Sequence, residues 1–230
     1  MRKYLFTIFT TLSLVFAFCT NSNAQFNFYK FSVGLGGGFT LPFADTKKAE
    51  YSLATQITTD YYFTPYLNTG LELQLGNMRG GDAGQGNFTN SFKLMSWNAR
   101  MQLGQFYDRY DKLNKITSII RGLYMGIGLG IIRSDVEAYS AYPEVPDVKG
   151  INHDLIFPVN MGGNVYFKDM YGRDRLELNF NFQLVVPMED TLDGNLNPYS
   201  NFNDLYNFAS IGFRYKFGVL GLDKRKNKLH

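Results

Sequence analysis

The stretch that decides the fold reads Phe-Ala-Ser-Ile-Gly-Phe-Arg-Tyr-Lys-Phe and covers residues 208–217. Its residues alternate between an apolar side and a side of small or charged residues. The apolar side carries Ala209, Ile211, Phe213, Tyr215 and Phe217, and the other side carries Ser210, Gly212, Arg214 and Lys216. Successive side chains of a strand point to opposite faces, so this strand needs an apolar medium on one face and a polar one on the other. The stretch therefore predicts a wall strand of a transmembrane β-barrel.

The same period of two recurs upstream in seven further segments. In the clearest of them, Leu71, Leu73 and Leu75 alternate with Glu72 and Gln74. The predicted strands cover residues 30–40, 50–63, 67–77, 91–106, 122–133, 155–168, 175–186 and 208–217. We therefore predict an all-β fold, an eight-stranded antiparallel transmembrane up-and-down β-barrel. An even number of strands places both termini on one side of the membrane, which we expect to be the periplasmic side.

The connections between the predicted strands differ in length. Short turns are predicted at Thr64-Pro65 and at Tyr171-Gly172, and the connection at 42–48 is also brief. Outer-membrane barrels combine short periplasmic turns with longer external loops. The polar, glycine- or proline-rich segments 78–90, 134–154 and 187–206 are therefore predicted to be external loops. The sequence gives no clear account of the connection at 107–121.

The N-terminus has the pattern of an export signal. Two basic residues, Arg2 and Lys3, precede a mainly apolar stretch at 5–18, and Ser22-Asn23-Ala24 offers small residues for cleavage. We predict a signal peptide at 1–24, a barrel domain at 25–217 and a basic periplasmic tail at 218–230. An alternative is a lipoprotein acylated at Cys19, although the preceding Phe18 is bulky where a lipobox has a small residue. Loss of Cys19 with the signal leaves no thiol for disulfides or catalysis.

Composition excludes several classes of protein. The formal net charge is +3, of which Arg2 and Lys3 supply two, so the chain is not a polybasic nucleic-acid binder. Aromatic residues make up 17% of the chain, which suits the aromatic girdles of a barrel. After the predicted signal, no apolar run is long enough for a membrane helix. The alternative fold is a soluble β-sandwich or lipocalin-like barrel, in which the apolar face points inward.

Six charged residues fall on the predicted inward face. They are Asp60, Glu72, Arg100, Glu177, Arg214 and Lys216. The lumen of an eight-stranded barrel is just wide enough for side chains to fill it, and unpaired charges there would be costly. We therefore predict that these residues pair and close the lumen. A narrow ion path or gate is the alternative.

Catalytic and metal sites are not predicted. His153 is the one histidine outside the C-terminal residue, and it lacks the serine pattern of barrel acyl hydrolases. A metal site in the loop at 134–154 would use Asp135, Glu137, Glu144, Asp147 and His153, but their spacing fits neither a calcium nor a zinc loop. We expect no enzyme activity, no metal and no cofactor.

The end of the last strand carries a polar residue, a glycine and two aromatic residues at a fixed spacing: Ser210, Gly212, Tyr215 and Phe217. This arrangement resembles the C-terminal assembly signal of bacterial outer-membrane barrels. With the export signal and the eight alternating segments, the chain resembles the small OmpA-like and OmpX-like barrels of the porin family, without a periplasmic domain. Peptidoglycan anchoring therefore does not carry over.

The resemblance implies a location in the outer membrane of a Gram-negative bacterium. The implied partners are outer-membrane lipid, lipopolysaccharide and the barrel assembly machinery, with no nucleic acid. It also implies a structural or adhesive role through the external loops. The alternative is a narrow pore, or an accessory barrel of a secretion or transport machine within an envelope complex.

Overall fold

The computed structural model describes residues 27–43, 49–82, 86–106, 115–140, 148–188 and 205–222. These residues form long strands, one two-residue strand and two short helices. The elements are β1 (Asn27–Phe43), β2 (Ala49–Glu50), β3 (Ser52–Thr64), β4 (Leu67–Asp82), β5 (Gly86–Gln102), the 3₁₀ helix η1 (Leu103–Gln105), α2 (Lys115–Gly122), β6 (Leu123–Ser140), β7 (Val148–Lys168), β8 (Asp174–Pro187) and β9 (Leu205–Leu222). The predicted signal peptide at 1–24 and the end of the predicted tail, 223–230, lie outside the described residues.

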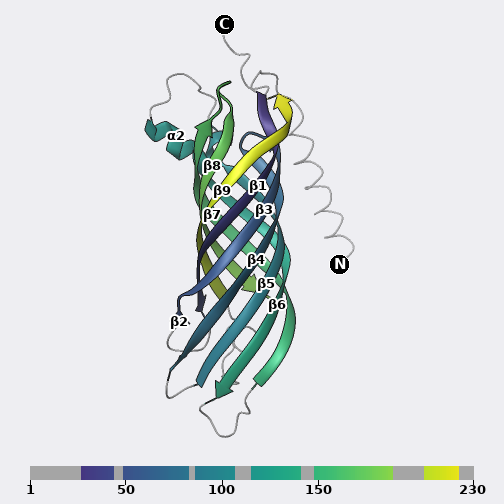
Figure 1. Cartoon of the computed structure of the whole chain (residues 1–230), viewed down its shortest axis with the longest axis vertical. Coiled ribbons are helices and arrows are strands. Elements are labelled where there is room, and N and C mark those ends of the chain that lie inside the picture. Colours follow the sequence, from purple (N-terminus) through teal and green to yellow (C-terminus); the bar gives the residue numbers. More distant parts are fainter. Residues whose placement is uncertain are drawn as a thin grey trace, which may run out of the picture.

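The strands close into a ring. Each long strand pairs antiparallel with its neighbours along the chain, and the pairing of β1 with β9 closes the barrel. The short β2 adds two pairs to β4 outside this ring of eight. Figure 1 shows a tall barrel whose strands are strongly tilted, with α2 and the ends of β1 and β9 near the upper rim. The predicted fold, an eight-stranded antiparallel up-and-down barrel of the transmembrane type, is confirmed.

The alternation in sequence becomes alternation in burial. Along β3, residues from Ser52 to Tyr62 alternate between buried and more exposed positions. The apolar residues Leu53 and Ile57 of this strand are exposed, whereas Gln56, Thr58 and Asp60 are buried. On β4, Asn77 lies on the outward face, and its neighbour Met78 points inward and is fully buried.

The strands extend further than predicted. β4, β5, β6 and β7 continue into residues 78–82, 86–90, 134–140 and 148–154, which were predicted to be loops. The last strand likewise continues beyond Phe217 to Leu222. The short turns were placed correctly: Thr64 Oγ1 accepts hydrogen bonds from the backbone N–H groups of Tyr66 (3.2 Å) and Leu67 (3.0 Å) and so fixes the first one. The turn after β7 covers residues 169–173.

The connection at 107–121, for which no structure was predicted, contains most of α2. The helix packs near the turn end of the barrel, where its Arg121 is buried with the guanidinium 5.1 Å from the centre of the Tyr66 ring. In the described part of the chain, no helix has both the length and the apolar character needed to cross a bilayer.

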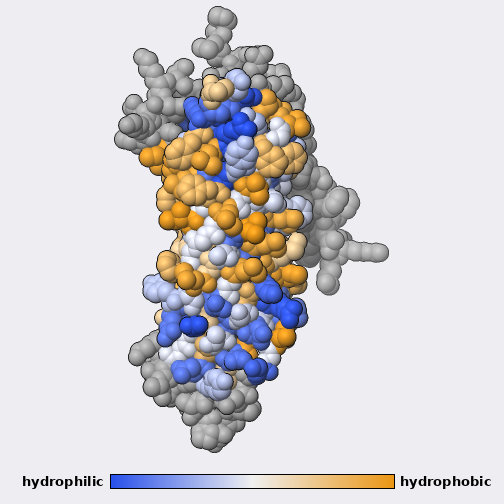
Figure 2. All heavy atoms as spheres, in the orientation of Figure 1, coloured by the Kyte–Doolittle hydropathy of each residue, from blue (hydrophilic) through white to orange (hydrophobic). Residues whose placement is uncertain are grey.

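The outer wall divides into two zones. On the face shown in Figure 2, an apolar band lies toward the end with the short turns, and polar residues predominate toward the opposite end. All eight strands of the ring contribute exposed apolar residues. On β6 every second residue from Leu123 to Ile131 is apolar and exposed, a length of about nine residues, which suffices for a tilted strand to cross a bilayer. The strands β4, β5, β6 and β7 continue beyond the apolar band. We call these continuations the protruding half; it comprises residues 77–82, 86–94, 132–140 and 148–154.

Candidate functional site

Six buried charged side chains form one continuous chain of ion pairs inside the barrel, at the level of the apolar band. We call it the charge chain. In order of contact it contains Glu72, Arg100, Asp60, Arg214, Glu177 and Lys216. Acids and bases alternate along it, and the members come from five strands. The structure thus brings together all six residues that the sequence placed in the lumen.

Arg100 on β5 joins the first two carboxylates. Its Nη1 donates to Asp60 Oδ1 at 3.0 Å, and its Nη2 donates to Glu72 Oε2. The three side chains are between 0 and 3% exposed. A single guanidinium therefore neutralises carboxylates from β3 and β4, as its planar fork of donors allows.

Glu177 on β8 joins the two cations of the last strand. Its Oε1 accepts a hydrogen bond from Arg214 Nη1 at 3.0 Å, and its Oε2 lies 2.9 Å from Lys216 Nζ. Arg214 Nε also lies 3.5 Å from Asp60 Oδ2, which connects this triad to Arg100. The charge chain contains three acids and three bases, so its formal charges cancel within the lumen.

Aromatic rings cover the cationic end of the charge chain. Lys216 Nζ lies 4.5 Å from the ring centres of both Tyr62 and Tyr166. Tyr62 is fully buried, so the ammonium is held between π faces in a site shielded from solvent. These contacts fix the position of Lys216 in addition to its ion pair.

A network of amide side chains packs beside the charge chain. Gln183 Nε2 donates to Glu72 Oε1 at 3.1 Å and to Asn160 Oδ1 at 2.9 Å, and Asn160 donates on to Asn98 Oδ1 at 2.9 Å. Gln74 Nε2 donates to Glu72 Oε1 at 2.6 Å. Buried polar groups are stable only where partners satisfy them, and this network supplies partners from β4, β5, β7 and β8.

The lumen changes character toward the protruding half. There most of the inward side chains are apolar and form one buried cluster, which we call the apolar plug. Its members are Ala54, Met78, Phe88, Phe92, Leu94, Ile132, Val136, Ala138, Ile156, Val185, Tyr206 and Phe208. The buried polar residues Asn90, Ser134 and Asp154 lie on the same inward face. The rings of Phe92 and Tyr206 lie 5.3 Å apart, and the Tyr206 hydroxyl donates to Gln74 Oε1 at 3.3 Å, so the plug joins the polar network below it.

The apolar plug was not predicted, because the predicted strands stop short of most of the protruding half and the expected sense of alternation was apolar outward throughout. Residues 87–93 instead carry polar side chains outward, with Phe88 and Phe92 inward beside the buried Asn90. The signal was present in the alternation of Phe88, Phe92 and Leu94 with Thr89, Ser91 and Lys93. A search for alternation of either sense would have found it.

The four residues of the predicted assembly signal lie on β9. Ser210 points inward and accepts a hydrogen bond from Gln56 Nε2 at 3.2 Å, and Tyr215 points outward and accepts one from Arg175 Nε at 2.9 Å. Gly212 lies opposite Gly36 at the β1–β9 seam, where an added Cβ would meet the Leu35 carbonyl oxygen at 3.0 Å. Phe217 stacks on Tyr215 with ring centres 6.4 Å apart. Recognition of this strand by an assembly machine stays a prediction.

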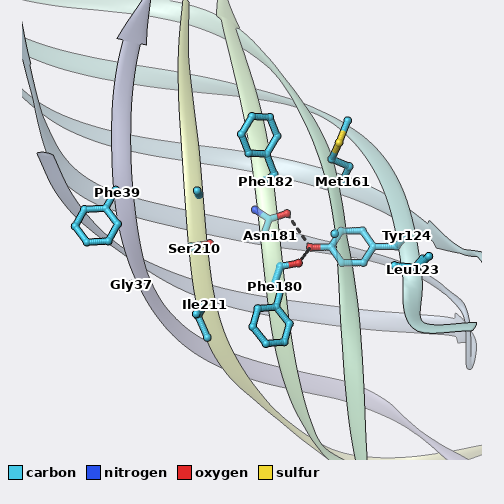
Figure 3. Close-up of a pocket in the computed structure, with 12 residues that line it drawn as sticks. Gly37, Phe39, Leu123, Tyr124, Met161, Phe180, Asn181, Phe182, Ser210 and Ile211 are labelled. Atoms are coloured by element: carbon cyan, nitrogen blue, oxygen red, sulfur yellow. Dashed lines mark hydrogen bonds between the residues drawn. The ribbon is translucent and has the colours of Figure 1, made fainter. Parts of the chain in front are cut away.

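A groove lies in the apolar band and is lined by residues of β1, β6, β7, β8 and β9 (Figure 3). Its volume is about 720 Å³, and its exposed walls include Phe39, Phe180 and Ile211. The depression arises because Gly37 and Ala209 offer little side-chain volume between these larger residues. From the inner face, the Tyr124 hydroxyl donates to Asn181 Oδ1 at 2.7 Å and fixes the wall behind it.

The residues considered for catalysis or metal binding do not converge. His153 is exposed on the outward face of β7, and Asp135 is exposed on β6. Glu137 pairs with Lys149, and Glu144 and Asp147 lie outside the described residues. Within the described segments, no group of three or more histidine, cysteine or acidic side chains is placed to hold a metal ion.

Comparison with solved structures identifies the same fold in other proteins. The barrel is similar to Neisserial surface protein A, with a TM-score of 0.51, 12% sequence identity, and coverage of 81% of this chain and 97% of that one. A second similar structure is Ail, the attachment invasion locus protein of Yersinia pestis in complex with the heparin analogue sucrose octasulfate, with a TM-score of 0.49, 8% identity, and coverage of 83% and 99%. No family model matches the sequence. No curated protein matches it either. The likeness to Neisserial surface protein A agrees with the barrel fold that the strand pairing shows.

Proposed function

We propose that this chain is an integral outer-membrane protein of a Gram-negative bacterium with a structural or adhesive role at the cell surface. One observation carries the proposal. The barrel wall is apolar outside and polar inside along the band, then mainly polar outside and mainly apolar inside along the protruding half. Such a wall suits a barrel that crosses a bilayer and continues into water as a solid, self-supporting stalk.

The filled lumen favours a structural or adhesive role over transport. The charge chain occupies the lumen at membrane level, and the apolar plug fills it further out. An ion would have to break buried ion pairs and then cross an apolar layer, both of which are costly. We therefore expect a barrel that does not conduct. Large stable conductance in planar bilayers would instead favour the narrow pore.

The protruding half provides the contact surface. The strands β4, β5, β6 and β7 pair with one another along their length. Their outward polar side chains therefore lie on one continuous sheet surface. Similarity to a protein named as a neisserial surface protein supports a surface location. In this orientation both termini and the turn at 169–173 face the periplasm, where the assembly machinery would receive the last strand.

Site-directed labelling tests the location and the orientation together. Thr89→Cys places a thiol on the exposed face of the protruding half, and Met170→Cys places one in the exposed turn at the opposite end. A membrane-impermeant maleimide on intact cells should label the first variant and should label the second only after the outer membrane is opened. The reverse order of labelling would mean that the orientation is inverted. Labelling of both on intact cells would argue against a barrel spanning the outer membrane.

Co-purification from native membranes separates a free barrel from a component of a larger machine. A barrel with a structural or adhesive role should be extracted in mild detergent without a stoichiometric protein partner. A stable complex with secretion components would favour the accessory-barrel alternative.

A further inference from the structure

Three neighbouring strands place basic side chains side by side at the border of the apolar band. Lys93 on β5 lies directly opposite Arg133 on β6, and Arg133 lies directly opposite His153 on β7. All three are exposed on the outward face. We call this set the border row. Directly opposite residues of antiparallel strands have Cβ atoms about 4.5–5.5 Å apart, so one ligand can reach two of them.

The position of the border row is defined by the rows on either side of it. On the membrane side, the next outward residues along the same three strands are Met95, Ile131 and Leu155, all exposed and apolar. On the other side they are Ser91, Asp135 and Ile151. The border row is therefore the first polar row beyond the apolar band, which is the depth at which lipid headgroups lie.

The border row has no acidic partner of its own within the described part of the chain. The ion pair on this outer face joins Lys149 to Glu137, which lie two rows further out. Asp135 lies one row out and forms no ion pair with Lys93 or Arg133 among the described residues. Like charges directly opposite one another destabilise a sheet unless an anion lies between them. The arrangement leaves room for an external anion between two fixed cations.

We propose that the border row binds the phosphate group of a phosphorylated glycolipid in the surrounding membrane leaflet, with Arg133 and Lys93 as its principal ligands. The proposal rests on the membrane location proposed above. A phosphate monoester carries about −1.5 to −2 charges at neutral pH, which matches the two fixed cations. Arg133 supplies a planar pair of donors for two phosphate oxygens, Lys93 supplies a point charge, and the His153 ring supplies an N–H donor. The acyl chains of the same lipid would pack on Met95, Ile131 and Leu155.

Binding to lipid A in reconstituted bilayers tests the proposal. The full chain is inserted into phosphatidylcholine nanodiscs that contain either diphosphorylated lipid A or dephosphorylated lipid A, and bound glycolipid is counted by native mass spectrometry. The unmodified protein should retain the phosphorylated form at least about tenfold more tightly, the equivalent of 1.4 kcal/mol. The Lys93→Gln/Arg133→Gln double variant should lose this preference. The matched control Lys149→Gln removes an exposed lysine of the same face, two rows away, and should keep it.

The remaining outcomes each decide the matter. Equal retention of both glycolipids, or an unchanged preference in the double variant, would overturn the proposed site. Displacement of the glycolipid by millimolar inorganic phosphate, with equal affinity for the free ion, would show a free-anion site and would also overturn it. Protease protection is measured on every sample: a chain that does not insert into nanodiscs at all would overturn the proposed membrane function, and with it the border-row site that rests on it.

Discussion

Residues 95–101 and residues 87–93 belong to the same strand, β5, and yet they meet opposite surroundings. The first stretch turns Met95, Trp97 and Met101 outward, whereas the second turns Ser91 and Lys93 outward and buries Phe92. The period of two continues without a break, and only its sense inverts. The same inversion occurs on β6 between Ile131 and Arg133. The period of a strand therefore predicts that it forms a sheet, and the sense of the alternation predicts where the membrane ends.

The two halves are stabilised by different forces. In the protruding half, burial of the apolar plug removes apolar surface from water, as in a soluble protein. In the apolar band the outward residues contact lipid, so the lumen must be held by ion pairs and hydrogen bonds, each of which needs a partner. Perturbing the polar lumen should consequently have the largest effect, and the predictions below start there.

Removal of the guanidinium that two carboxylates share should have the largest effect. Arg100→Met leaves Asp60 and Glu72 buried without their common cation, and should lower the free energy of unfolding by about 3–5 kcal/mol. The measurement is a urea titration of the protein folded in lipid vesicles.

Glu72→Gln alone and combined with Arg100→Met completes a double-mutant cycle. Because the two residues pair directly, the double change should be milder than the sum of the single changes, with a coupling of about 0.5–3 kcal/mol. Strict additivity would mean that Glu72 and Arg100 do not stabilise the fold as a pair. The stability of the polar lumen within the apolar band would then need another explanation.

A charge placed on the outer face should separate the two halves of a single strand. Leu71→Arg puts a cation at the middle of the apolar stretch of β4, and should cost about 2–4 kcal/mol. Asn77→Arg puts the same side chain on the same face of β4, within the protruding half. Such a surface change should alter stability by no more than about 0.5 kcal/mol. Equal losses in the free energy of unfolding at both positions would mean that both residues face the same medium, and would contradict a membrane border between them on β4.

The fold could be predicted from the sequence because lipid and lumen impose the same alternation on every strand. The inward set Asp60, Glu72, Arg100, Glu177, Arg214 and Lys216 followed from that alternation, since a register error of one residue would have placed these charges in lipid. Their order along the charge chain could not be predicted, because it depends on how the tilt of the strands stacks residues from β3, β8 and β9. The two-residue alternation in the sequence carries no information about the tilt of the strands or the shear of the barrel.

The strands of the protruding half were not predicted, because their sequence resembles that of loops. Segments 78–90 and 134–154 contain glycines, asparagines and charges, which are typical of turns, and the inward apolar residues between them are widely spaced. In the structure these polar residues lie on a strand face that contacts water. The polar residues begin where the exposed apolar band ends, but they were wrongly taken to mark the end of the strands.

Two adjacent isoleucines on β6 provide a smaller and matched test of the apolar plug. Ile132 is 1% exposed and belongs to the plug, whereas Ile131 is 56% exposed on the outer face. Ile132→Val should cost about 0.5–1.5 kcal/mol because it leaves a small cavity in a packed interior. Ile131→Val should be nearly neutral, since lipid chains can fill the space. A larger loss at Ile131 than at Ile132 in the same urea titration would mean that the plug is not the packed core of the protruding half.

The turn at 169–173 gives the smallest expected effect, and the only one that depends on pH. Burial by itself would raise the pKa of Asp169, but hydrogen bonds from the backbone N–H of Arg173, the Tyr29 hydroxyl and the backbone N–H of Tyr171, together with the Arg173 guanidinium, lower it below its ordinary value of 3.8. Because the pKa is lower in the folded state, the carboxylate stabilises the fold above the unfolded pKa, and this contribution is lost as the pH falls through the folded pKa. Asp169→Asn keeps one side-chain oxygen, which can still accept hydrogen bonds from the backbone N–H groups of Tyr171 and Arg173, but it removes the charge and the second oxygen, which accepts from the Tyr29 hydroxyl. The unmodified protein should therefore be slightly more stable than the variant at neutral pH, and the two urea midpoints should converge in acid. Midpoints that differ by a constant amount from neutral pH down to pH values well below 3.8 would show that the charge of Asp169 contributes nothing, and that the turn is held by its neutral hydrogen bonds alone.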